Sequence, residues 1–178
     1  EDLRAHDVVI LLSKPAFGPP LYWHQDYINW NSPAAATPWP TKIFLSYYMT
    51  DTNRDNGCLR VIPGTHRHRI DLHDILPNAH EAEIQALEDY GHPAFLDRDD
   101  AIDIPLRAGD LVIGDARLMH GAWPNGTDQR RTLILAWHDV FQFPQPPSWW
   151  TGEIPEAVRT ADPGVSYEST RTPSQFIV

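Results

Sequence analysis

Short apolar runs, several of them rich in β-branched residues, alternate with polar turns along most of the chain. Runs of this length, bounded by Gly, Pro, Asn and Asp, are typical of β-strands, and their fairly regular spacing favours a jelly roll. The predicted strands cover residues 8–12, 21–27, 43–49, 58–62, 102–106, 111–115 and 131–137. The pattern therefore predicts an all-β core, in which successive side chains point to opposite faces.

The polar stretch at residues 51–57 separates two of these strands and ends on Asn56 and Gly57. Both residue types tolerate positive φ, so this pair is typical of a tight hairpin turn. The sequence thus predicts that residues 58–62 return beside residues 43–49.

The alternating pattern stops between residues 67 and 103. Ile84 and Leu87 stand among charged residues there and predict a short helix over residues 79–90. We interpret residues 67–103 as an insertion of helix and loop between two strands, not as a second domain.

The length of 178 residues predicts a single domain, with its core at about residues 8–140. The remaining stretch, residues 142–178, contains six prolines. We expect it to be irregular and to wrap the core or contact a partner.

Acidic side chains outnumber basic ones by 24 to 14, which gives a formal net charge of −10. An acidic surface disfavours nucleic acids and anionic membranes as partners. Cys58 is the single cysteine, so no internal disulfide can form, which suits a reducing cytoplasm. Apolar runs are too short to span a bilayer, and the first residues lack a signal-peptide pattern. We therefore expect a cytoplasmic protein; these patterns do not determine its oligomeric state.

His24 and Asp26 stand two residues apart in an aromatic, apolar stretch. On an extended strand such residues point to the same face and can reach one metal ion together. His120 is the best candidate for a third ligand. Two histidines and one carboxylate are typical of non-haem Fe(II) oxygenases, although these ligand types also suit Zn, Mn or Ni.

Further motifs accompany this pair in a fixed order. They are Ser13-Lys14-Pro15, Trp23-His24-Gln25-Asp26, the run from Asn56 to His66, Gly109-Asp110, His120 and Arg131. With these spacings, from about Ile10 to about His138, the chain resembles the phytanoyl-CoA dioxygenase family of Fe(II)/2-oxoglutarate oxygenases.

The resemblance implies a double-stranded β-helix, the jelly-roll or cupin-like fold, closing around iron. It implies that His24, Asp26 and His120 are the catalytic metal ligands, and that Arg131 holds the distal carboxylate of 2-oxoglutarate. The implied cofactors are Fe(II), 2-oxoglutarate and O2. Family members usually carry further sequence ahead of the first strand, including helices that brace the major sheet. Here strand-like sequence begins by Val8, so the chain is either a compact version or lacks its N-terminal part.

Charge counting independently supports an arginine in the site. Fe(II) with one aspartate leaves one positive charge, dianionic 2-oxoglutarate turns this into one negative charge, and one guanidinium restores neutrality. An arginine fork also suits a carboxylate better than lysine does. Arg130 is the rival of Arg131, because neighbouring strand residues face opposite sides and both alternating rows of this strand are plausible inner rows. The family spacing favours Arg131.

Four residues near the expected site are candidates to line the pocket for 2-oxoglutarate or substrate, and ordinary core packing is the alternative reading for each. They are Tyr22, Ser46, Tyr48 and Trp137.

The reaction that the resemblance implies is hydroxylation of a C–H bond in a small organic molecule, with oxidative decarboxylation of 2-oxoglutarate to succinate and CO2. Related halogenases lack the carboxylate ligand, so Asp26 favours hydroxylation; desaturation and ring formation stay open. One alternative is an oxygenase of acyl-CoA or carrier-bound substrates, against which the acidic composition argues mildly. Another is a non-catalytic binding module of the same fold, against which the complete ligand set and Arg131 argue.

Overall fold

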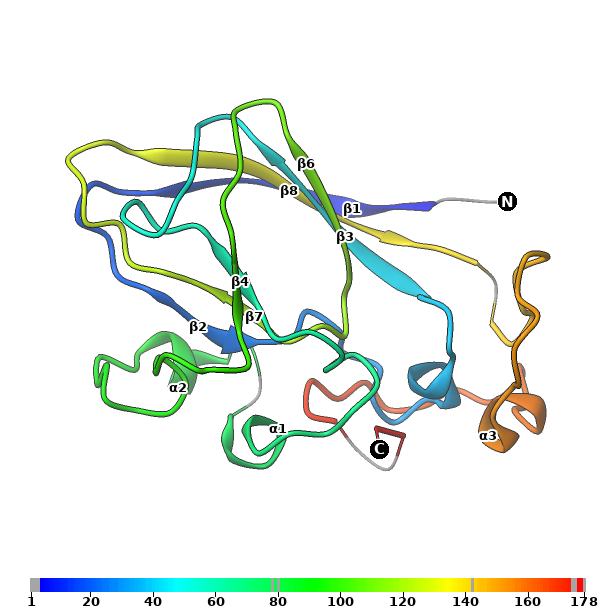
Figure 1. Ribbon diagram of the computed structural model, residues 1–178. Helices are drawn as coiled ribbons and strands as arrows, with labels where there is room; N and C mark the ends of the chain where they lie inside the picture. The colour runs from blue at the N-terminus through cyan, green and yellow to red at the C-terminus, as the bar shows by residue number, and fades with distance from the viewer. Residues whose placement is uncertain (1–3, 78, 80, 142, 174–175, 178) are drawn as a thin grey trace.

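Two four-stranded antiparallel sheets face each other in the computed structural model, which describes residues 4–77, 79, 81–141, 143–173 and 176–177 (Figure 1). The first sheet consists, in spatial order, of β1 (Arg4–Lys14), β8 (Arg131–Asp139), β3 (Lys42–Tyr48) and β6 (Leu111–Asp115). The second consists of β2 (Leu21–His24), β7 (His120–Ala122), β4 (Leu59–Val61) and β5 (Ile102–Ile104). This arrangement confirms the predicted all-β double-stranded β-helix.

The predicted hairpin at Asn56 and Gly57 is wrong, because β3 and β4 belong to opposite sheets. Gly57 has the positive φ of +91° that the turn requires, while the Asn56 side chain closes the loop by donating to the Asp51 carbonyl. The chain therefore reverses there, yet it passes to the opposite sheet instead of pairing with the strand it left. A local turn signal reports reversal of direction and contains no information about the pairing partner.

The inner rows of β3 and β8 lie side by side, since the register pairs Phe44 with Trp137 and Tyr48 with Leu133. Directly opposed residues of an antiparallel pair share a face of the sheet. Buried side chains alternate along β3, and Arg131 and Leu133 are buried on β8. Strand pairing thus selects the row that contains Arg131.

The segment between β4 and β5 forms single helical turns, α1 (Leu72–Ile75) and α2 (Ala82–Gln85). The helix predicted over residues 79–90 is therefore too long; His80 lies outside the described residues. Ile84 is deeply buried and Leu87 only partly, and one anchoring side chain does not stabilise several helical turns. None of the helices in the described part of the chain has the length and apolar character needed to cross a bilayer.

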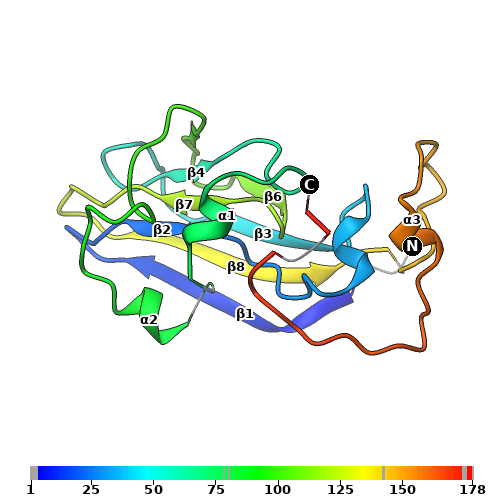
Figure 2. The same ribbon diagram turned by 90° about the horizontal axis from the view of Figure 1, so that it is seen from below.

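The C-terminal stretch is mostly irregular, with one helical turn, α3 (Glu156–Arg159), that contacts the 3-10 helix η1 (Pro33–Ala36). Residues 142, 174–175 and 178 of this predicted tail lie outside the described part. Beyond α3 the tail runs back toward the middle of the molecule, near α1 (Figure 2). It pairs there with the segment that follows β2, through a parallel bridge between Thr170 and Asn29.

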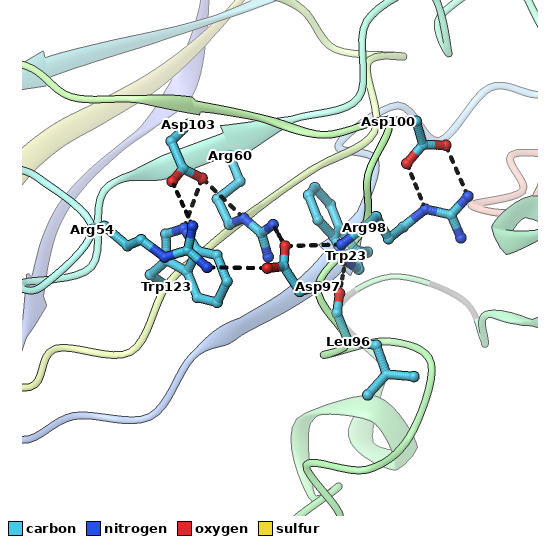
Figure 3. Close-up of polar contacts among 9 residues, drawn as sticks. All are labelled: Trp23, Arg54, Arg60, Leu96, Asp97, Arg98, Asp100, Asp103 and Trp123. Carbon is cyan, nitrogen blue, oxygen red and sulfur yellow. Dashed lines mark hydrogen bonds and ion pairs between the residues drawn. The ribbon is translucent and has the colours of Figure 1, made fainter.

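A stack of cationic and aromatic side chains fastens the 67–103 segment to the second sheet (Figure 3). The Arg60 guanidinium lies 3.6 Å from the ring centroid of Trp123 and 4.9 Å from that of Trp23. It also pairs with Asp97 and Asp103. Since Trp23 precedes a candidate metal ligand in sequence, this layer braces the outer side of the candidate site.

Replacing Arg60 with methionine should lower the free energy of unfolding by about 2 kcal/mol. The change removes a buried guanidinium that contacts two aromatic rings and pairs with two carboxylates. Arg54 provides the matched control: it contacts Trp123 and the same two carboxylates, yet its side chain is 61% exposed. Arg54→Met should lower the free energy of unfolding, measured by urea denaturation, by less than about 1 kcal/mol. Equal losses would show that the stack does not anchor the segment.

Candidate metal centre

His24, Asp26 and His120 converge on one point between the sheets, with one possible ligand atom from each lying within 4.8 Å of the others. Strand pairing brings the histidines together, because His24 ends β2 directly opposite His120, the first residue of β7. Both His24 Nε2 and His120 Nε2 lie 3.6 Å from oxygens of the Asp26 carboxylate. The three side chains predicted as ligands are therefore adjacent.

The histidine hydrogen bonds show that these residues fit a divalent metal. His24 Nδ1 lies 2.9 Å from the Tyr22 carbonyl, and His120 Nδ1 lies 2.9 Å from the Leu118 carbonyl. A carbonyl oxygen only accepts, so each Nδ1 carries a proton, and in the neutral imidazole each Nε2 then presents its lone pair toward the Asp26 carboxylate. Two unprotonated imidazole nitrogens that face a carboxylate are a set of donors that can bind a metal cation. The hydrogen bonds at Nδ1 select the histidine tautomer that this binding needs.

Tyr22 does not line the cavity beside these residues, so its predicted position is corrected. The pairing of β2 with β7 contains an irregularity between Leu21 and His24, where β2 has one extra residue. A bulge of this kind reverses the alternation of side chains. Leu21 and His24 therefore both face the cavity, while the Tyr22 ring packs with Ile84 and Ala94 beneath the second sheet.

Gln25 faces away from the metal ligands, as the alternation predicts, and holds the ligand segment in place. Its side-chain amide donates to the Arg117 carbonyl and contacts His73 Nε2 at 3.2 Å. His73 is buried, and this burial lowers its pKa below the ordinary value. His73 lies far from Gln25 in sequence and reaches it only through the fold of the 67–103 segment.

A cavity of about 590 Å³ lies between the sheets and contains the three candidate ligands in its wall. Ser46, Tyr48 and Trp137 line it, as proposed from the sequence, together with mostly aliphatic side chains. The Phe44 ring lies over His120, with 5.0 Å between the ring centroids. Residue 114 must be glycine for this ring position, since a Cβ there would lie 2.2 Å from the ring.

Arg131 lines one end of the cavity, whereas Arg130 points outward and donates to the Ser13 hydroxyl at 3.1 Å. Burial lowers the pKa of Arg131. The guanidinium lies 6.0 Å from the ring centroid of Tyr48. Among the described residues, Arg131 Nε is buried without a hydrogen-bond partner. A buried guanidinium with an unused donor is a receptor for an anion.

Lys14 stands next to this guanidinium, directly across the β1–β8 pair, and was not identified as a site residue from the sequence. Its amine donates to the carbonyls of Pro19, at 2.9 Å, and Trp123, at 2.6 Å. Burial, and secondly the charge of Arg131, lower its pKa to about 7. Its place in the Ser13-Lys14-Pro15 motif was the available signal.

The lowered pKa of Lys14 predicts a pH-dependent stability. Between pH 7 and pH 10.5 the unfolded chain holds a proton that the folded chain releases, so the free energy of unfolding rises with pH. Relative to a Lys14→Met variant, the wild type should gain about 1 kcal/mol per pH unit between pH 7.5 and pH 9.5. Urea denaturation of both proteins at these two pH values measures the difference; parallel pH profiles would contradict the titration of Lys14.

A family model described as phytanoyl-CoA dioxygenase (PhyH) matches residues 4–133. Ectoine dioxygenase of Bordetella bronchiseptica is 26% identical over 166 residues, covering 83% of this chain and 50% of the relative. A probable alpha-ketoglutarate-dependent hypophosphite dioxygenase of Stutzerimonas stutzeri is 27% identical over 138 residues, covering 76% of this chain and 44% of the relative.

The crystal structure of AviO1 from Streptomyces viridochromogenes Tue57 is also similar. Its TM-score is 0.52 at 26% sequence identity, with 82% of this chain and 54% of that chain covered. The chain spans about half the length of the curated relatives it matches.

Proposed function

Because this chain belongs to the phytanoyl-CoA dioxygenase (PhyH) family, we propose that it is the catalytic core of an Fe(II)- and 2-oxoglutarate-dependent dioxygenase that hydroxylates a small organic molecule. The observation that carries the proposal is the convergence of His24, Asp26 and His120 in the wall of a cavity that also contains Arg131. We propose that residues 8–140 form one catalytic domain, with residues 67–103 as an insertion and the tail as its cover.

His24 Nε2, His120 Nε2 and a carboxylate oxygen of Asp26 would hold the iron. With iron and 2-oxoglutarate bound, the site supplies oxidising power: O2 gives one oxygen atom to succinate, as CO2 leaves, and the other to a substrate C–H bond. Asp26 would take the ligand position that a halide needs, which favours hydroxylation over halogenation.

The protein's own contribution is to bind, orient and exclude water. Arg131 would bind the distal carboxylate of 2-oxoglutarate through a charge-assisted fork, which burial strengthens. Tyr48 and Ser46 follow along the same inner row of β3 toward the candidate ligands. Leu133, Leu135 and other aliphatic side chains of the wall keep bulk water from the reacting centre.

Succinate formation tests the proposal. Purified protein is loaded with Fe(II) without oxygen, mixed with 2-oxoglutarate and exposed to air, alone and with a panel of small molecules and acyl-CoA thioesters. We expect succinate that requires both iron and air and that increases with a free small-molecule substrate. Stimulation by thioesters alone would favour the acyl-CoA alternative, and absence of succinate throughout would favour a non-catalytic binding module.

A further inference from the structure

We propose that Arg171 binds an acid group of the substrate, at the end of the cavity opposite Arg131. The inference rests on the proposed function and names the substrate class of that site: a small molecule with an apolar body and a carboxylate.

The strand register defines the two ends of the cavity. On β3 the inward side chains run from Tyr48, near Arg131, through Phe44, which contacts His120, to Lys42. Lys42 and Tyr48 are six residue steps apart along the strand, which is about 20 Å. The candidate metal ligands therefore lie between the ends, and space beyond them remains when 2-oxoglutarate extends from Arg131 to the metal.

The tail places Arg171 at this second end. Ser169 Oγ lies 3.0 Å from Asn29 Oδ1, and the Trp30 amide donates to the Thr170 carbonyl at 3.4 Å. Ile177 then packs with Trp30 in a buried cluster. These contacts fix the tail beside the segment that follows Asp26, so that Arg171 lines the cavity with Ile28 although it lies far away in sequence.

The charges in the cavity wall distinguish Arg171 from the other cations. The described lining contains three cations, Lys42, Arg131 and Arg171, and one carboxylate, Asp26. Lys42 is matched by the carboxylate of Asp139 at 2.7 Å, and Arg131 is assigned to 2-oxoglutarate.

Arg171 donates to the Ala79 carbonyl at 2.9 Å, and its ion-pair partner Glu81 is 3.9 Å away and 54% exposed. An exposed pair of this length neutralises little charge. Since the iron site is neutral once Arg131 and 2-oxoglutarate are counted, a substrate carboxylate on Arg171 would neutralise the remaining cation.

The wall between the two ends is apolar, which defines the rest of the substrate. Ile10, Ile28, Leu135 and Trp137 line this part of the cavity. Such a surface favours a hydrocarbon body, and the cation at its end favours an acid over a neutral analogue.

Ligand binding to a non-reacting form tests the inference. Protein loaded with Zn(II) and 2-oxoglutarate is titrated in a calorimeter with hexanoate, octanoate and decanoate, and with the matched primary amides. At least one carboxylate should bind about tenfold to a hundredfold more tightly than its amide. Arg171→Met should abolish this preference and Arg171→Lys should restore part of it. Arg159→Met, an exposed change in the same tail, should leave it intact.

Equal binding of acids and amides, no binding by any carboxylate, or a preference that survives Arg171→Met would each overturn the inference. Unchanged thermal melting of the variants shows that they fold. The succinate assay separates the two proposals: succinate without an acid preference removes only this inference, whereas an acid preference without succinate removes the reaction and leaves the anion site.

Discussion

Replacing Asp26 with alanine is expected to abolish succinate formation and to weaken Fe(II) binding at least about a hundredfold, since the metal loses its one anionic ligand. The metal-free variant should fold, because the Asp26 carboxylate faces the Nε2 atoms of two histidines at 3.6 Å, and these contacts serve metal binding more than folding. Metal titration and thermal melting measure both effects. Iron should raise the melting temperature of the wild type and leave that of the variant unchanged.

Asp55→Ala is the matched control, because Asp55 is an exposed carboxylate in the loop between β3 and β4. It should bind iron and form succinate as the wild type does. Full turnover by Asp26→Ala would remove Asp26 from the metal, and equal losses in both variants would point to a general effect of charge.

The second large effect is expected for Arg131→Met: the KM for 2-oxoglutarate should rise about a hundredfold or more, with iron affinity unchanged. The cause is the unpaired carboxylate that the variant leaves in a desolvated site. Arg131→Lys should recover only part of the affinity, because an ammonium lacks the planar fork. Initial rates of succinate formation at varied 2-oxoglutarate measure KM.

Stability should change in the opposite direction to activity in this variant. Arg131 is buried, and burial lowers its pKa, so the folded protein bears a cost for holding the charge there. Arg131→Met should therefore melt no lower than the wild type in the absence of ligand. Arg130→Met, on the outward row, should change neither KM nor melting; a raised KM in that control would contradict the assignment of the inner row.

Residues close in sequence made the candidate metal pair predictable. His24 and Asp26 need only an extended backbone to share a face, and the sequence shows both that backbone pattern and the residue types. His120 required the family resemblance, because nothing local to residue 120 reveals that β7 pairs with β2.

Features that depend on strand pairing were less predictable. Periodicity left both rows of β8 open, and the pairing with β3 selects Arg131. The extra residue in β2 moved Tyr22 out of the cavity, and a bulge has no distinct signature in an aromatic run. Asn56 and Gly57 indicated a turn correctly, yet the partner of each strand depends on which apolar faces meet across the interior.

Side chains supplied by irregular segments were the least predictable. Arg171 follows a Pro-rich stretch with no periodic pattern, and it reaches the cavity only because Thr170 bridges to Asn29. The sequence alone indicates only that Lys14 is a polar residue at the end of a strand. Its position beside Arg131 arises from the β1–β8 register, and its lowered pKa arises first from burial and secondly from the charge of Arg131.

X-ray anomalous scattering at the iron absorption edge tests the central claim most directly. Crystals soaked with Fe(II) without oxygen should show one strong peak at bonding distance from the Nε2 atoms of His24 and His120 and from a carboxylate oxygen of Asp26. Soaking with 2-oxoglutarate as well should add density between that peak and Arg131. No iron peak among these three side chains, or a peak only elsewhere, would contradict the account.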